Sequence, residues 1–156
     1  FSKDKSPYKT SHWITFKRSR KEWQNFPAFF FEISPEAYRY GMGFFSADRA
    51  TMDRFRASID ANPAAFLARV AFHSQQDEFV IEGEQYKRPL KTHFPSDLRA
   101  DWGRLNDWYQ RKNLYLVCNC PVDAQGVPPG LADTLKRGFQ TLAPLYHDLS
   151  SIAASV

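Results

Sequence analysis

The sequence contains little cysteine: only Cys118 and Cys120 occur among its 156 residues. Two cysteines cannot form the disulfide network of a small secreted domain, so we expect a protein of the reducing cytoplasm. They form a lone Cys-x-Cys pair, whereas structural zinc sites use four ligands, commonly from two pairs. We therefore interpret them as small buried thiols of a strand and expect no metal site. The histidines offer no second pair, since they are dispersed singly as His12, His73, His93 and His147.

Glycine is also scarce, with seven residues, and no glycine loop for a nucleotide cofactor is present. Gly41-x-Gly43 lacks the third glycine of the dinucleotide motif and is followed by two phenylalanines, so we interpret it as part of a strand. No G-x-S-x-G motif marks a catalytic serine. No apolar run approaches the roughly 18 residues of a membrane-spanning helix. The sequence thus predicts no cofactor and no membrane association, and it leaves any catalytic residues unknown.

Aromatic residues, in contrast, are abundant, with 14 Phe, 7 Tyr and 4 Trp. Together with a hydrophobic content of 43%, they predict one domain, residues 1–156, built around a core of bulky side chains. The formal net charge is +4, yet residues 1–22 alone hold seven Lys or Arg against two Asp or Glu, a net +5. An electrostatic partner would therefore meet the N-terminal segment first.

The spacing of apolar residues predicts an alternation of strands and helices. We expect strands at 12–18, 28–33, 38–45 and 114–120, and a strand, a Gly83 turn and a short return within 79–88. Helices are expected at 47–60 with Ser46 as N-cap, at 63–72, at 96–112 and at 130–154, the last kinked by Pro144. Runs of like elements favour the α+β class, with a mostly antiparallel sheet and a single layer of helices.

Three stretches set Lys or Arg beside Tyr, at residues 3–10, 86–93 and 108–112. Lysine supplies a point charge for phosphate, arginine a two-pronged donor, and tyrosine a hydroxyl or a stacking face. If the fold brings these stretches together, they form a cationic pocket. The alternative is that each cation is solvated and each aromatic ring covers the edge of the core.

Four strings resemble a family: FSKDKSPYKTSH, YGMGFFSADRATMDRFRASI, EQYKRPLK and WYQRKNLYL. In this order they resemble domain-of-unknown-function family 2461, whose most specific motif matches residues 1–10, and Lys87, Arg88 and Pro89 match its later basic element. The resemblance implies a helical region and an Arg before Phe1, so we expect an N-terminally truncated family domain. It also implies a glycine-rich segment, which is reduced here to Gly41 and Gly43. It supplies no reaction.

The first hypothesis for function is binding of an anionic ligand by these basic loops. The ligand is a phosphate-bearing metabolite, a nucleotide or a nucleic-acid backbone. The predicted ligand-binding residues are Lys5, Tyr8, Lys9, Lys87 and Arg88, with Asp4 orienting a lysine and Pro7 stiffening the turn. Two alternatives stay open. One is an enzyme of unknown reaction that uses the Lys, Tyr and Asp of the first motif. The other is a purely structural role for that motif.

Overall fold

The fold is built on one antiparallel sheet. The computed structural model describes residues 10–19, 24–72, 78–122 and 126–155. Its sheet has five strands in the order β1-β2-β3-β5-β4, and every neighbouring pair is antiparallel. These strands are β1 (His12–Phe16), β2 (Ala28–Ile33), β3 (Ala37–Phe44), β4 (Val80–Glu82) and β5 (Leu114–Pro121).

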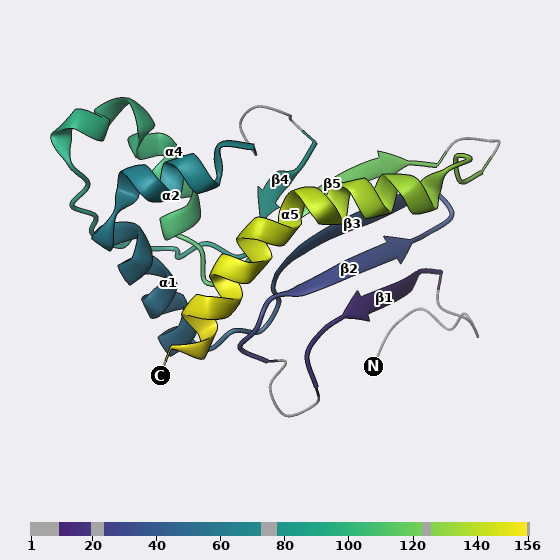
Figure 1. Cartoon of the computed structure of the whole chain (residues 1–156), viewed down its shortest axis with the longest axis horizontal. Coiled ribbons are helices and arrows are strands. Elements are labelled where there is room, and N and C mark those ends of the chain that lie inside the picture. Colours follow the sequence, from purple (N-terminus) through teal and green to yellow (C-terminus); the bar gives the residue numbers. More distant parts are fainter. Residues whose placement is uncertain (1–9, 20–23, 73–77, 123–125, 156) are drawn as a thin grey trace.

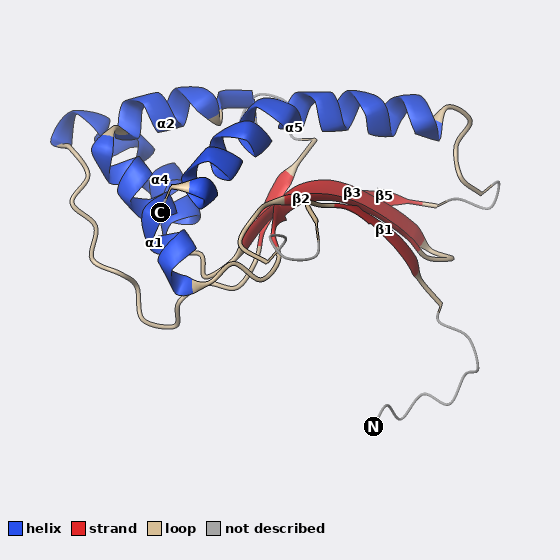
Figure 2. Cartoon of the chain, turned by 60° about the horizontal axis from the view of Figure 1, so that its bottom comes forward, coloured by secondary structure: helices blue, strands red, loops and turns tan. Residues whose placement is uncertain are grey.

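The helices lie on one side of this sheet. They are α1 (Arg49–Ala61), α2 (Pro63–Arg69), the 3-10 helix η1 (Ser96–Asp101), α4 (Trp102–Tyr109) and α5 (Leu131–Ala154). Figures 1 and 2 show α5 running along one face of the sheet, while α1, α2 and α4 gather beside one end. In the described part of the chain no helix covers the opposite face, which we call the open face. The α+β class and the mostly antiparallel sheet are confirmed.

Side chains alternate between the two faces as the strand period requires. In β3, Tyr38, Tyr40, Met42 and Phe44 are buried in the core beneath α5. Phe29, Phe31 and Ile33 of β2 pack against the same core, as the sequence pattern predicted. Phe30 and Glu32 therefore face the open side of the sheet.

Two turn details differ from the sequence-based expectation. Helix α1 is capped by Asp48 and not by Ser46, because the Asp48 carboxylate accepts the Thr51 backbone N–H at 2.7 Å. The chain after Gly83 does not return as a hairpin. It continues beside the segment that leads into β5, since Gln85 forms an antiparallel β-bridge with Arg111 just beyond the β4–β5 ladder. Gly83 lies between β4 and this bridge, and its positive φ of 128° allows the irregular backbone there.

Helix α5 packs closely against the sheet because a glycine, Gly138, lies at the point of contact. Gly138 is buried directly over the Tyr40 ring, and a Cβ there would lie about 3.1 Å from the Tyr40 hydroxyl oxygen. Tyr40 cannot easily move aside, since its ring meets Phe79 and Phe139 edge-on and its hydroxyl donates to Glu78 at 2.8 Å. The helix changes direction along its length, consistent with Pro144 in its interior (Figure 1).

No helix in the described ranges has both the length and the apolar character that crossing a bilayer requires.

The Gly138 contact predicts opposite effects for two glycine-to-alanine changes. Gly138→Ala should lower the free energy of unfolding by about 1–3 kcal/mol, because the new methyl group overpacks the Tyr40 ring. Gly103→Ala is the matched control, since Gly103 lies in α4 with no atom within 4 Å of the new Cβ. It should raise stability by up to about 1 kcal/mol through helix propensity. Urea unfolding of both variants measures this, and equal shifts would contradict close packing at Gly138.

Candidate binding pocket on the open face

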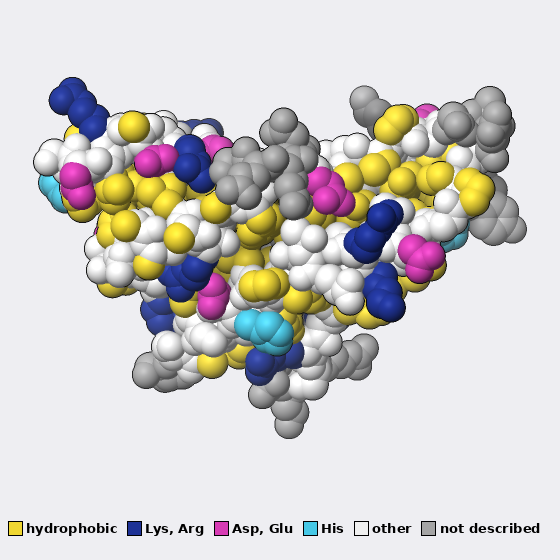
Figure 3. All heavy atoms as spheres, turned by 45° about the horizontal axis from the view of Figure 1, so that its top comes forward, with side chains coloured by type: hydrophobic (Ala, Val, Ile, Leu, Met, Phe, Trp, Pro, Cys, Tyr) yellow, Lys and Arg dark blue, Asp and Glu magenta, His cyan; other side chains and the backbone are white. Residues whose placement is uncertain are grey.

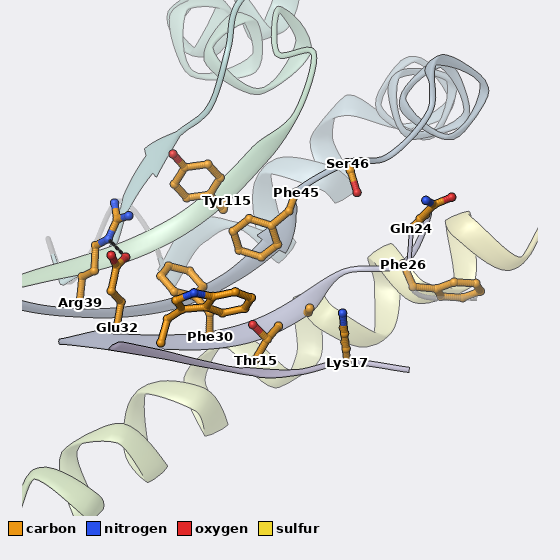
Figure 4. A pocket seen from close by; sticks show the side chains of 12 residues that line it. Thr15, Lys17, Gln24, Phe26, Phe30, Glu32, Arg39, Phe45, Ser46 and Tyr115 are labelled. Carbon is orange, nitrogen blue, oxygen red and sulfur yellow. Dashed lines mark hydrogen bonds and ion pairs between the residues drawn. The ribbon is translucent and has the colours of Figure 1, made fainter. Parts of the chain in front are cut away.

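A hollow of about 440 Å³ lies on the open face of the sheet (Figure 4). Strands β1, β2, β3 and β5 contribute to it, as do the ends of the loops that precede β2 and α1. Its lining combines aromatic rings with polar and charged side chains, the two kinds of group that a small-molecule site uses. The lining residues are Trp13, Thr15, Lys17, Gln24, Phe26, Ala28, Phe30, Glu32, Arg39, Phe45, Ser46 and Tyr115.

Small residues of the central strands make the hollow possible. Gly41 pairs with Phe30 and Gly43 pairs with Ala28, so three small residues occur together on this face. Both ladders of β3 are continuous in register, which excludes a bulge at the glycines. A Cβ on either glycine would collide with backbone atoms of β5, at Leu116 or Leu114. The pair thus marks a close approach of two backbones.

Three aromatic rings stand together above these glycines. Phe45 stacks on Tyr115 with ring centroids 5.5 Å apart and planes 18° apart. Phe30 meets Phe45 edge-on at 5.3 Å and Tyr115 edge-on at 6.3 Å. Trp13 of the edge strand β1 adds a fourth ring, and it is 63% exposed. These rings offer faces and edges on which another flat ring can pack.

One end of the pocket carries an ion pair. Glu32 and Arg39 are cross-strand partners in the β2–β3 ladder, and Arg39 Nε lies 2.6 Å from Glu32 Oε2. The Arg39 side chain is 44% exposed and that of Glu32 is 26% exposed. Figure 4 shows Lys17 and Gln24 at the other end of the pocket, beyond the aromatic rings. The lining therefore holds two cations and one carboxylate.

The loop before β2 is held at the pocket by the N-terminus of α1. Asn25 Nδ2 donates to Asp48 Oδ2 at 3.0 Å, and the Asp48 backbone N–H donates to Asn25 Oδ1 at 3.0 Å. A hydrogen bond from the Thr51 backbone N–H lowers the pKa of Asp48, so the carboxylate is charged at neutral pH and accepts from Thr51 and from Asn25 Nδ2. This contact positions Gln24 and Phe26, which lie on either side of Asn25 and line the pocket.

Comparison with protein families identifies the chain. A family model described as "Conserved hypothetical protein (DUF2461)" matches residues 1–147. The chain belongs to this family. Searches of the curated proteins and of the solved structures found no match. The resemblance seen in the sequence motifs is thus confirmed, and the fold described above is that of a DUF2461 domain.

Residues 1–9 of the family motif at the start of this DUF2461 chain lie outside the described residues. Its predicted ligand-binding residues, Lys5, Tyr8 and Lys9, and their supports, Asp4 and Pro7, therefore have no described position. The strand that follows them, β1, is an edge of the sheet, and β4 is the opposite edge. A site shared by the first motif and the later basic loop stays a prediction.

The other two basic stretches do lie side by side. The Tyr86 backbone N–H donates to the Gln110 carbonyl at 3.0 Å, and the Leu90 backbone N–H donates to Gln110 Oε1 at 2.8 Å. Lys87 and Arg88 are exposed on this loop. Neither forms an ion pair with any residue that the structure describes.

Within the third stretch, arginine has a structural role. Arg111 is 8% exposed and donates to the Gly83 carbonyl at 2.9 Å, the Asp107 carbonyl at 3.0 Å and the Asp107 carboxylate at 2.9 Å. Its own carbonyl accepts from buried Arg56 at 3.0 Å. Lys112 pairs with Glu84 at 2.5 Å. These cations connect the end of α4 to the β4 region, so they are engaged within the protein.

The two thiols lie on the α5 face, away from the pocket. Their sulfur atoms are 3.4 Å apart, and burial raises the pKa of Cys118 to about 11. A hydrogen bond to Cys120 raises the pKa of Tyr38 to about 12, and burial raises that of Tyr40. These groups stay protonated at neutral pH, as buried groups of the core do. No three His, Cys, Asp or Glu side chains within the described ranges are grouped as metal ligands.

The pocket residues were not among those predicted from the sequence. Two features of the sequence could have indicated the pocket. Gly41 and Gly43 share one face of a strand, and Phe30 and Glu32 share one face of the strand before it. Tyr115 and Trp13 come from strands far away in the chain, and only the sheet order places them at the same hollow.

The contrast between Arg111 and Arg88 predicts different mutational costs. Arg111→Ala should lower the free energy of unfolding by about 2–4 kcal/mol, because it removes a buried side chain and leaves two carbonyls and a carboxylate without their donor. Arg88→Ala removes an exposed arginine and should change stability by no more than about 0.5 kcal/mol. Thermal and urea unfolding compare the two variants. A small loss of stability in Arg111→Ala would show that the hydrogen bonds of Arg111 do not hold the chain after β4 in place.

Proposed function

We propose that this DUF2461 domain binds a small organic anion with a flat apolar ring in the open-face pocket. The observation that carries the proposal is the aromatic hollow built on Ala28, Gly41 and Gly43, with Arg39 at its end. Such a hollow buries a flat molecule on several sides, and the few polar groups orient it.

The ring part of the ligand follows from the geometry of the aromatic side chains. Phe30, Phe45 and Tyr115 already contact one another in stacked and edge-on arrangements, which are the favoured geometries for aromatic pairs. Trp13 exposes most of its surface at the pocket wall. A bound ring packs among them and removes apolar surface from water, which supplies most of the affinity.

The negative charge of the ligand follows from the charged groups of the lining. Lys17 and Arg39 together outweigh Glu32 by one positive charge. The chemistry agrees with the anionic ligand expected from the basic-aromatic stretches, although the site is a different one. The face drawn in Figure 3 shows basic and acidic side chains interspersed, with no extended basic surface for a long polyanion there.

Binding is favoured over catalysis at this pocket. Its described lining includes no histidine or cysteine, and its carboxylate, Glu32, is paired with Arg39 at 2.6 Å. This carboxylate is therefore already engaged by the arginine. The enzyme hypothesis for Asp4 and Tyr8 concerns residues outside this pocket lining.

Binding of 2-naphthoate, measured by titration calorimetry, tests the proposal. We expect Phe45→Ala to weaken binding about tenfold, because one stacked ring is lost from the pocket. Phe16→Ala is the control, since Phe16 is a similarly exposed ring on the α5 face of the sheet and should leave the affinity unchanged. Absence of binding by both 2-naphthoate and 2-naphthyl phosphate, or equal loss of 2-naphthoate affinity in both variants, would reject the open-face pocket as the site.

A second function is favoured by the exposed cations of the loop after β4. Lys87 and Arg88 make no ion pair with described residues, and we propose that they contact phosphate groups of a nucleotide, a phosphorylated metabolite or a nucleic-acid backbone. Lys5, Tyr8 and Lys9, with Asp4 and Pro7, are the predicted partners in that site. The family motifs that contain both sets support this proposal.

Salt dependence of oligonucleotide binding tests the second function. Three or four cations on phosphates give a log–log slope of affinity against salt of roughly −2 to −4. Replacing both Lys87 and Arg88 by Ala should make the slope less steep by about 1 to 2. Arg137→Ala on α5 is the control and should not change it. Binding that is absent at low salt, or independent of salt, would rule out a backbone-binding role.

A further inference from the structure

The ion pair at the end of the pocket leaves part of Arg39 available to a ligand. Arg39 bonds to Glu32 through Nε, at 2.6 Å from Oε2. Its two terminal nitrogens make no hydrogen bond to a described residue. A guanidinium whose Nε is engaged still presents these two nitrogens side by side, and their spacing matches the two oxygens of a carboxylate.

Glu32 also determines how much negative charge this end of the pocket tolerates. Its carboxylate is only 26% exposed, lies beside Arg39 in the ladder and cancels the charge of the guanidinium. A singly charged ligand group forms two hydrogen bonds with Arg39 at little electrostatic cost. A doubly charged phosphate makes the same bonds but is repelled more strongly by Glu32. Lys17 lies at the other end of the pocket (Figure 4), so Glu32 is the charged group paired with Arg39 here.

We infer that the ligand of this pocket is an aromatic monocarboxylate. Its carboxylate binds the terminal nitrogens of Arg39, and its ring packs among Phe30, Phe45 and Tyr115. Glu32 is the residue that selects against aromatic phosphates. This inference rests on the proposed binding function and adds the chemical class of the ligand.

The pocket lining includes a further donor, the Tyr115 hydroxyl. In Figure 4 this hydroxyl points to the same side of the pocket as the Arg39 guanidinium. No described residue forms a hydrogen bond with it. This hydroxyl is a donor that adds no positive charge to the pocket, which suits a monoanion.

A matched pair of probes tests the inference on the whole chain. The probes are 2-naphthoate and 2-naphthyl phosphate at pH 8, where the phosphate carries two charges. We expect 2-naphthoate to bind about tenfold tighter to the wild-type protein. Glu32→Gln keeps an oxygen that accepts from Arg39 Nε but removes the negative charge. This variant should improve phosphate binding about tenfold more than carboxylate binding, so that the preference disappears.

Two further variants complete the design. Glu82→Gln removes a carboxylate from the same sheet face at β4, outside the pocket lining, and should leave the preference as in the wild type. Arg39→Gln should weaken 2-naphthoate at least tenfold. Thermal melts confirm that each variant is folded.

The results distinguish failure of the proposed ligand class from failure of the pocket's proposed binding function. The inference is overturned if the phosphate binds as tightly as the carboxylate to the wild type, or if Glu32→Gln changes their ratio by less than twofold. In either case the aromatic pocket still binds an anion and the proposed function stands. If neither naphthyl compound binds, the proposed function itself fails, and the ligand class fails with it.

Discussion

The fold depends on the contact between α5 and the central strand β3. Tyr40 is 1% exposed, and it is held between Gly138 of the helix, the edges of Phe79 and Phe139 and a hydrogen bond to Glu78. This contact commits one face of the sheet to the core. Strands alternate their side chains, so it also decides that Phe30, Glu32 and Arg39 face the other way. The pocket is therefore a consequence of how the helix packs.

The open face is hollow because its centre has almost no side chains. Gly41 and Gly43 bring β3 close to the backbone of β5, and larger residues there would both clash and fill the hollow. Phe30 is buried among the aromatic rings that surround this floor, whereas Phe45, Tyr115 and Trp13 stay in contact with solvent. An arrangement of this kind costs stability, since apolar rings remain partly exposed, and such exposure is a common mark of a binding surface.

Local signals in the sequence predicted most of the elements of this fold. The strand at 28–33 matches β2 residue for residue, and Asn62 followed by Pro63 starts α2 as the cap and first-turn proline require. The errors have physical causes. Ser46 and Asp48 are both good caps, and the contact of Asp48 with Asn25, distant in sequence, decides between them. The basic residues of 108–112 seemed equally suited to a ligand, but burial of Arg111 depends on the chain after β4, which no local pattern shows.

The pocket was harder to predict because it depends on strand register. Glu32 and Arg39 are opposite each other only because the β2–β3 turn is tight, with the Ser34 backbone N–H bonded to the Ala37 carbonyl at 2.7 Å and the Ser34 hydroxyl accepting from the Ala37 N–H. A slip of one residue would place Arg39 opposite Ile33 or Phe31, whose side chains face α5, and the ion pair would be lost. The same slip would move Gly41 away from Phe30 and remove the floor beneath the rings. The positions of the glycines and of the ion pair therefore both depend on the turn. A site of this kind can be predicted from the sequence only when the register of its hairpin is known.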